Sequence, residues 1–120
     1  MANARTYICG LDAAVDLIGG KWKPLILWEL SMGVRRFGEL RQALAGVSEK
    51  MLAQQLREME RDGLVHRAVL AEVPPRVEYS LTSLGESLNR ALEPLGDWGH
   101  SHMERIVALR GGTTTSIERG

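Results

Sequence analysis

The apolar positions of this chain recur mostly at helical spacing, and the pattern changes once to short, strand-like segments. Side chains three or four residues apart predict helices over residues 11–18, 24–32, 37–44, 48–62 and 83–109. Two short strands are expected over residues 64–70 and 77–81, joined by a turn that contains two prolines. The sequence therefore predicts a mainly α fold with a small β-hairpin.

Glycines and capping residues support several of these boundaries. Pro24 suits the first position of a helix, and Gly33 suits the position just after its end. Ser48 is a good N-cap for the fourth helix, which Gly63 ends. Leu25–Leu30 leaves little polar surface, so we expect the second helix to be central and buried.

The last helix carries two further signals. Thr82 or Ser83 can cap its start, and Ser83 with Glu86 fits a capping box. Pro94 lies inside the apolar stripe and predicts a kink or a break, because proline removes a helical hydrogen bond.

The order of elements indicates a winged helix-turn-helix. Two short helices are joined by a tight turn around Gly46, and a hairpin follows the second of them directly. With 120 residues the chain fits one domain. We expect this domain to span residues 9–110, between a flexible arm at 1–8 and a flexible tail at 111–120.

The fourth predicted helix carries the clearest candidate for a binding surface. If its stripe of Leu52, Leu56 and Met59 faces the core, the opposite face holds cations and an amide but no acid. These side chains are Lys50, Gln54, Arg57 and Arg61. Lys and Arg can bind guanine or phosphates, and Gln can pair with adenine. An ordinary solvated helix face has the same composition, so this alternative remains open.

The hairpin offers a second candidate. Pro74-Pro75 stiffens its tip, and Arg76 follows directly. We expect Val77, Tyr79 and Leu81 to alternate inward, which leaves Arg76 to reach a phosphate or the minor groove. A turn with a solvated arginine is the alternative.

Three stretches resemble the HxlR-type branch of the MarR-like winged helix-turn-helix transcription regulators. They are LIGGKWKPLILWEL, RRFGELRQALAGVSEKMLAQQLREMERDGLVHR and PPRVEYSLTSLGESL, and together they cover roughly residues 9–98. The resemblance implies a homodimer that binds inverted-repeat, palindromic operators in double-stranded DNA. Its expected DNA-contacting residues are Arg36, Ser48, Lys50, Gln54, Gln55, Arg57, Arg61 and Arg76.

The same resemblance implies a dimer built from the first and last helices. The expected interface residues are Leu11, Val15, Leu88, Leu92, Leu95 and Trp98. It also implies that Cys9, the single cysteine, senses oxidants or electrophiles, since several members of the family carry a sensing cysteine at this position. The family commonly has proline after this cysteine, where this chain has Gly10.

Physical chemistry leaves two interpretations of Cys9 open. Thiols at helix N-termini are often reactive, and Arg5 is close enough in sequence to add positive charge. Alternatively, Cys9 is a small side chain packed at a dimer interface.

Composition narrows the remaining classes of function. The net charge is zero, with 15 basic and 15 acidic residues, which counts mildly against nucleic-acid binding. No enzyme motif, cofactor motif or metal-ligand spacing is present, and His66, His100 and His102 are scattered. No apolar run is long enough to span a membrane and no signal peptide is evident, so we expect a cytoplasmic protein.

Two further interpretations of the sequence remain open. One is a winged helix that binds another protein without DNA. The other is a small-molecule effector pocket lined by Trp22, Trp28 and Trp98, which we otherwise expect in the core and the dimer interface.

Overall fold

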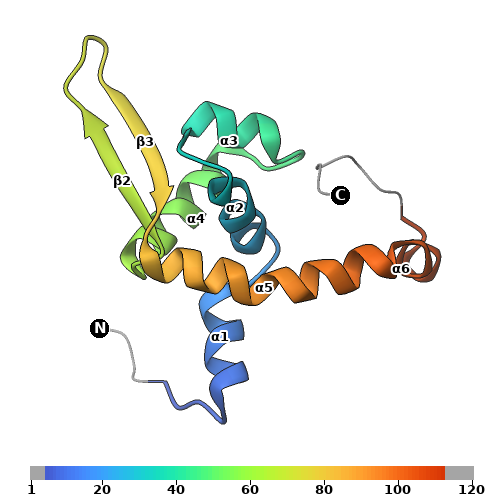
Figure 1. Ribbon diagram of the computed structural model, residues 1–120. Coiled ribbons are helices and arrows are strands. Elements are labelled where there is room, and N and C mark those ends of the chain that lie inside the picture. Colours follow the sequence, from blue (N-terminus) through green and yellow to red (C-terminus); the bar gives the residue numbers. More distant parts are fainter. Residues whose placement is uncertain (1–4, 113–120) are drawn as a thin grey trace.

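Six helices and three short strands form a winged helix with an extension at each end, in a computed structural model that describes residues 5–112. The helices are α1 (Gly10–Ile18), α2 (Trp22–Ser31), α3 (Phe37–Ala43), α4 (Glu49–Arg61), α5 (Ser83–Ser101) and α6 (Met103–Arg110). The strands are β1 (Arg35–Arg36), β2 (Val65–Leu70) and β3 (Arg76–Leu81). Figure 1 places the β2–β3 hairpin and α1 at opposite ends of the molecule, with α5 running between them. The predicted fold class is confirmed.

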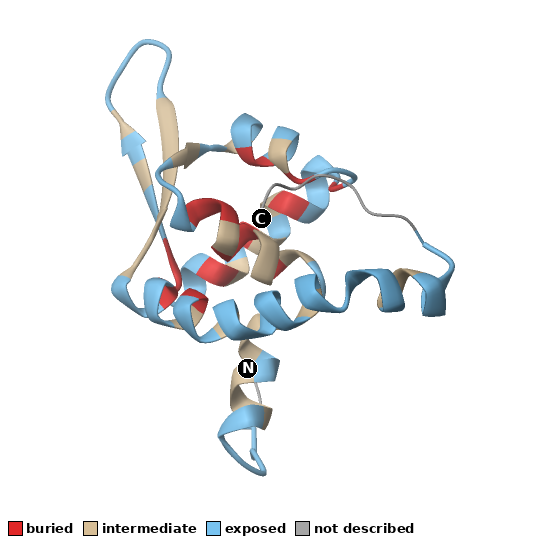
Figure 2. Ribbon diagram, turned by 45° about the vertical axis from the view of Figure 1, so that its right-hand side comes forward, coloured by how far each residue is buried: buried red, intermediate tan, exposed pale blue. Residues whose placement is uncertain are grey.

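The core lies where α2, α3 and α4 meet the base of the hairpin (Figure 2). The fully buried side chains come from all these elements, and they are Ile26, Leu27, Leu40, Leu44, Leu52, Leu56, Met59, Leu64 and Val65. Three of them, on α4, form the stripe that the sequence predicts to face inward. Their burial fixes which face of α4 points outward.

Several helix ends differ from the sequence prediction. Helix α2 begins at Trp22, so Pro24 occupies its third position, where a missing N–H is still harmless. Thr82 caps α5 by accepting a hydrogen bond from the Gly85 N–H, so the capping box expected at Ser83 and Glu86 is wrong. Helix α5 continues through Pro94 and ends at Ser101. The break therefore falls near His102, and α6 follows as a separate helix.

The sheet contains a strand that the sequence did not reveal. Its order is β1-β3-β2, and both neighbours pair antiparallel with β3. Strand β1 has only two residues, with Arg35 opposite Tyr79 and Arg36 opposite Glu78. A strand this short has no periodicity to detect, and it becomes visible only through its pairing.

A close backbone contact anchors the hairpin to the start of α5. The Leu64 carbonyl accepts a hydrogen bond from the Thr82 N–H at 3.1 Å, and the Thr82 hydroxyl donates to the Gly63 carbonyl at 2.6 Å. A Cβ atom at Gly85 would overlap the Leu64 carbonyl oxygen. Only glycine therefore allows α5 to begin this close to the hairpin.

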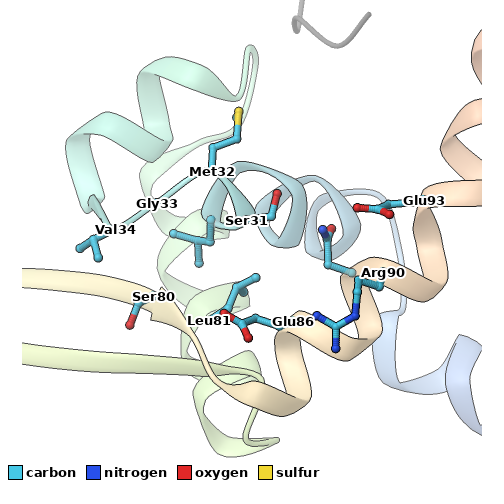
Figure 3. Close-up of a pocket in the computed structure, with 11 residues that line it drawn as sticks. Ser31, Met32, Gly33, Val34, Ser80, Leu81, Glu86, Arg90 and Glu93 are labelled. Atoms are coloured by element: carbon cyan, nitrogen blue, oxygen red, sulfur yellow. The ribbon is translucent and has the colours of Figure 1, made fainter.

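A pocket of about 510 Å³ lies where the end of α2, the end of β3 and one face of α5 meet (Figure 3). Its lining is mostly polar and contains no tryptophan. The tryptophan-lined pocket considered from the sequence therefore differs from this one. Trp22 packs partly buried against the core, and Trp98 is exposed and stacks on His102.

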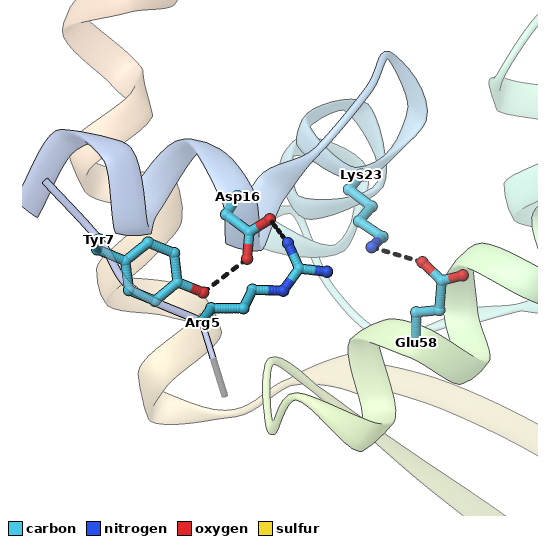
Figure 4. Close-up of polar contacts among 5 residues, drawn as sticks. All are labelled: Arg5, Tyr7, Asp16, Lys23 and Glu58. Carbon is cyan, nitrogen blue, oxygen red and sulfur yellow. Dashed lines mark hydrogen bonds and ion pairs between the residues drawn. The ribbon is translucent and has the colours of Figure 1, made fainter. Parts of the chain in front are cut away.

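The predicted arm and tail lie partly outside the described residues, which exclude 1–4 and 113–120. Within the described part, residues 5–8 are held against α1 rather than free (Figure 4). Asp16 accepts hydrogen bonds from Arg5 at 2.6 Å and from the Tyr7 hydroxyl at 2.7 Å, and Asp12 accepts one from the Ile8 N–H. The bond to the Asp16 carboxylate raises the pKa of Tyr7.

Candidate nucleic-acid interface

Helix α4 is oriented by its cap and its buried stripe. The Ser48 hydroxyl accepts a hydrogen bond from the Met51 N–H at 3.0 Å, which starts the helix where the sequence predicts. The burial of Leu52, Leu56 and Met59 then turns the opposite face outward. Helix α4 follows α3 after a tight turn, so it is the second helix of the helix-turn-helix unit.

The outward face of α4, formed by Lys50, Gln54, Arg57 and Arg61, is exposed as predicted. Within residues 5–112 none of its three cations forms an ion pair. The Gln54 amide makes one weak contact, donating to Glu58 at 3.3 Å. The outward face therefore keeps its positive charge available to a ligand.

Two acids that flank this face are neutralised by other elements. Glu49 pairs with Arg41 of α3 at 2.9 Å. Glu58 pairs with Lys23 of α2 at 2.6 Å, and the hydrogen bond from Lys23, with a smaller one from Gln54, lowers the pKa of Glu58 (Figure 4). These pairs reduce the negative charge beside the outward face and hold α4 against both neighbouring helices. The sequence prediction missed Lys23, since an ion pair between distant helices leaves no local pattern.

The other predicted contacts near α4 have different surroundings. Ser48 is exposed but already serves as the helix cap. Gln55 is half-buried, so it is a weaker candidate than Gln54. Arg36 is exposed at the start of α3, where its N–H donates to Glu39 at 2.7 Å. Its guanidinium makes no ion pair with any described residue and is open to a phosphate.

Arg76 does not project freely from the hairpin, and this part of the prediction is wrong. Its Nη2 lies 3.0 Å from Glu72 Oε2, and its Nε lies 3.5 Å from Glu78 Oε2. We call Arg76, Glu72 and Glu78 the wing clamp. The sequence held a signal for it, since Glu78 is two residues from Arg76 and so shares its face of the strand.

Arg67 is a candidate that the sequence prediction did not include. It is exposed on β2 and lines a groove of about 350 Å³ between α4 and the hairpin, together with Arg57 of the outward face. Tyr79 and Glu60 line the same groove. Arginines from two different elements, α4 and β2, thus line one groove.

Helix α1, which Cys9 precedes, lies at the end of the molecule remote from the hairpin (Figure 1). Cys9 is exposed and occupies the N-cap position of α1. Arg5, considered as a source of positive charge for the thiol, instead pairs with Asp16 at 2.6 Å. The expected location at a helix start is confirmed, whereas the expected contribution of Arg5 is not supported.

Helices α1 and α5 expose an apolar surface. Helix α1 has no buried residue, and Leu11, Val15, Leu95 and Trp98 are each more than half exposed. Leu88 and Leu92 pack partly buried against the protein's own core. The predicted stripe on α5 therefore divides into an inner part, which holds the helix to the winged helix, and an outer part open to a partner.

No group of His, Cys, Asp and Glu within residues 5–112 is arranged to hold a metal ion. None of the described helices is long and apolar enough to cross a membrane.

The fold and the cationic outward face of α4 define a winged helix-turn-helix protein. The model of the HxlR-like helix-turn-helix family matches residues 17–107, so the chain belongs to this family of transcriptional regulators. The HTH-type transcriptional regulator YdeP of Bacillus subtilis (strain 168) is 45% identical over 101 residues, which are 84% of this chain and 79% of YdeP.

Two solved structures extend the comparison. The reduced form of the redox regulator HypR has a TM-score of 0.78 and 39% identity, over 83% of this chain and 99% of HypR. The reduced form of the transcriptional regulator YodB from B. subtilis has a TM-score of 0.69 and 35% identity, over 77% of this chain and 91% of YodB. The resemblance seen in the sequence is confirmed at the level of family and fold.

Proposed function

We propose that this protein binds double-stranded DNA as a homodimer and regulates transcription without catalysing a reaction. The observation that carries the proposal is the outward face of α4, where three cations and an amide lie exposed with no acid among them. A face of this chemistry on the second helix of a helix-turn-helix suits the major groove. Arg36 and Arg67 are then phosphate or minor-groove contacts, and Arg76 becomes one if DNA displaces its two acidic partners. Because its relatives come from bacteria and an archaeon, we place its action in the cytoplasm.

The dimer is proposed from the exposed apolar surface of α1 and α5. Leu11, Val15, Leu95 and Trp98 leave water if a second copy covers them, which favours association. A twofold dimer presents two copies of α4 to half-sites whose centres lie about 34–36 Å apart or a multiple of this. An operator with inverted symmetry follows from this arrangement.

A response to oxidants is also proposed, through Cys9. The thiol is exposed at the start of α1, beside the apolar surface that the dimer would cover. The similarity to HypR, which is named a redox regulator, supports this role. Since the chain has one cysteine, a disulfide formed when an oxidant such as diamide removes two electrons joins Cys9 to a second subunit or to a small thiol. Either product changes the seam between subunits and hence the spacing of the two α4 helices.

The test is footprinting on DNA upstream of the protein's own gene, with and without diamide. We expect two protected half-sites, and we expect binding to weaken steeply with salt. Arg57→Ala should weaken binding, whereas Arg110→Ala, a matched change on α6, should leave it intact. Wild-type affinity in the double variant Arg57→Ala, Arg76→Ala would contradict the assigned contacts.

Absence of any salt-dependent DNA binding would favour a protein-interaction module. A Cys9→Ser variant that still responds to diamide would refute the sensor.

A further inference from the structure

The pocket between α2, β3 and α5 has the size of a small-molecule site, with a lining more polar than is usual for one. Its volume of about 510 Å³ falls within the range of about 300–1,000 Å³ that is usual for such sites. Leu30, Val34 and Leu81 supply apolar walls, and α5 supplies most of the polar groups. The pocket lies apart from the outward face of α4 and from Cys9.

Three charged side chains of α5 line the pocket without partners. Glu86, Arg90 and Glu93 are spaced four and three residues apart, which places them on one face of the helix. Within the described residues none of the three forms an ion pair. Figure 3 shows all three on α5, where Glu93 lies beside α2, Glu86 lies beside Leu81, and the Arg90 side chain extends along α5 on the side away from Met32 and Val34. The C-terminal end of α2 adds partial negative charge to the same pocket.

The pocket also holds a buried amide that lacks a hydrogen bond. Asn89 is only 7% exposed, and within residues 5–112 no hydrogen bond to its side chain is formed. Its amide atoms are nevertheless not sealed from solvent, so the small exposed part of this side chain opens into the pocket. Buried polar groups normally have partners, so in the open pocket the Asn89 amide is bonded by water or by a ligand that replaces this water.

We propose that this pocket binds a small zwitterion of the amino-acid type. Two carboxylates and the end of α2 favour an ammonium group, and Arg90 favours a carboxylate. The Asn89 amide can donate to the carboxylate or accept from the ammonium group. A simple amine leaves Arg90 unpaired, and a simple acid meets the two glutamates. The zwitterion is the class that satisfies all four polar side chains.

The binding itself is independent of the proposed DNA function, but its regulatory consequence rests on that function. Helix α5 carries the pocket residues on one side and the exposed Leu95 and Trp98 further along. Helix α2 belongs to the core that orients α4. A ligand held between α2 and α5 therefore contacts both the winged helix and the proposed dimer helix.

The first measurement is thermal unfolding of the full chain with each of the twenty common amino acids, followed by calorimetry on those that raise the melting temperature. Each ligand found is compared with its decarboxylated amine and its deaminated acid. We expect both analogues to bind at least about tenfold more weakly, as is usual when one charged hydrogen bond is lost. No stabilisation by any amino acid would overturn the proposal, and so would equal binding of the amine or the acid.

Variants locate the site. Arg90→Gln and Glu93→Gln change exposed side chains, so the fold should persist, and each should weaken binding at least about tenfold. Arg105→Gln, a matched change of an exposed arginine on α6, should bind as the wild type does. Unchanged binding in Arg90→Gln would overturn the assignment. Operator binding is measured separately, so failure of the DNA proposal and failure of the ligand proposal give different results.

Discussion

The ammonium group of Lys23 lies 2.6 Å from the carboxylate of Glu58, and the Lys23 side chain is only 10% exposed. This pair joins the central helix α2 to α4. Replacing Lys23 by Met should cost about 1–3 kcal/mol of the free energy of unfolding, because Glu58 loses its partner in a partly buried site. The double variant Lys23→Met, Glu58→Leu should recover much of the loss. Urea unfolding of the wild type, the two single variants Lys23→Met and Glu58→Leu, and the double variant measures the coupling between the two side chains. Strictly additive effects of the two substitutions would contradict this coupling.

The same pair predicts a pH dependence of stability. Since the pKa of Glu58 is lowered in the folded protein, its contribution is present above the unfolded value of about 4.3. This contribution is lost as the pH falls through the lowered folded value. The wild type should therefore lose more stability between pH 7 and pH 3 than the Lys23→Met variant loses. Urea titrations at pH 7 and pH 3 measure the free energy of unfolding of both proteins. If the wild type and the Lys23→Met variant lose the same amount between the two pH values, the pair is excluded as a cause of the pH dependence.

The close approach at Gly85 predicts a sharp difference between two glycines. Gly85→Ala should destabilise the protein by about 1–3 kcal/mol or more, because the added methyl group meets the rigid Leu64 carbonyl. Gly38→Ala in α3 has nothing within 4 Å of the added atom and should cost nothing. Chemical denaturation compares the two variants. A tolerated Gly85→Ala would mean that the start of α5 can move away from the hairpin.

The wing clamp predicts that two acids restrain DNA binding. In the double variant Glu72→Gln, Glu78→Gln, Arg76 is released and two negative charges are removed, so operator affinity should rise about threefold to tenfold. Glu104→Gln, which removes a remote charge on α6, should change affinity little. Gel-shift titrations at two salt concentrations measure these effects. If the gain is undiminished in an Arg76→Ala background, the clamp has no role.

The exposed surface of α1 and α5 predicts how the dimer can be separated. Leu95→Glu should produce monomers at micromolar concentration, because dimerisation would bury an unpaired charge. Val69→Glu alters an equally exposed apolar residue on β2 and should leave the oligomeric state unchanged. Sedimentation velocity measures both, with circular dichroism as a check on folding. A Leu95→Glu dimer would remove this surface from the interface.

The sequence by itself determined the elements whose signals are local. The cap at Ser48, the stripe of Leu52, Leu56 and Met59 and the outward face of α4 all follow from side chains within one helix. Their positions were predictable because helical geometry converts spacing into direction. The existence of the two hairpin strands was also predictable, but the expected inward alternation was not found, since every residue of β3 is half-buried and Tyr79 and Leu81, but not Val77, pack against the core.

Only the tertiary structure decided the relationships between distant segments. Strand β1 exists because Arg35 and Arg36 meet β3, and helix α5 passes through Pro94, where the sequence predicted a kink or a break. The ion pair of Lys23 and the pocket around Asn89 each join residues whose proximity no spacing encodes. Local patterns specify which way a side chain faces, but its partner and its charge environment depend on how the elements pack together.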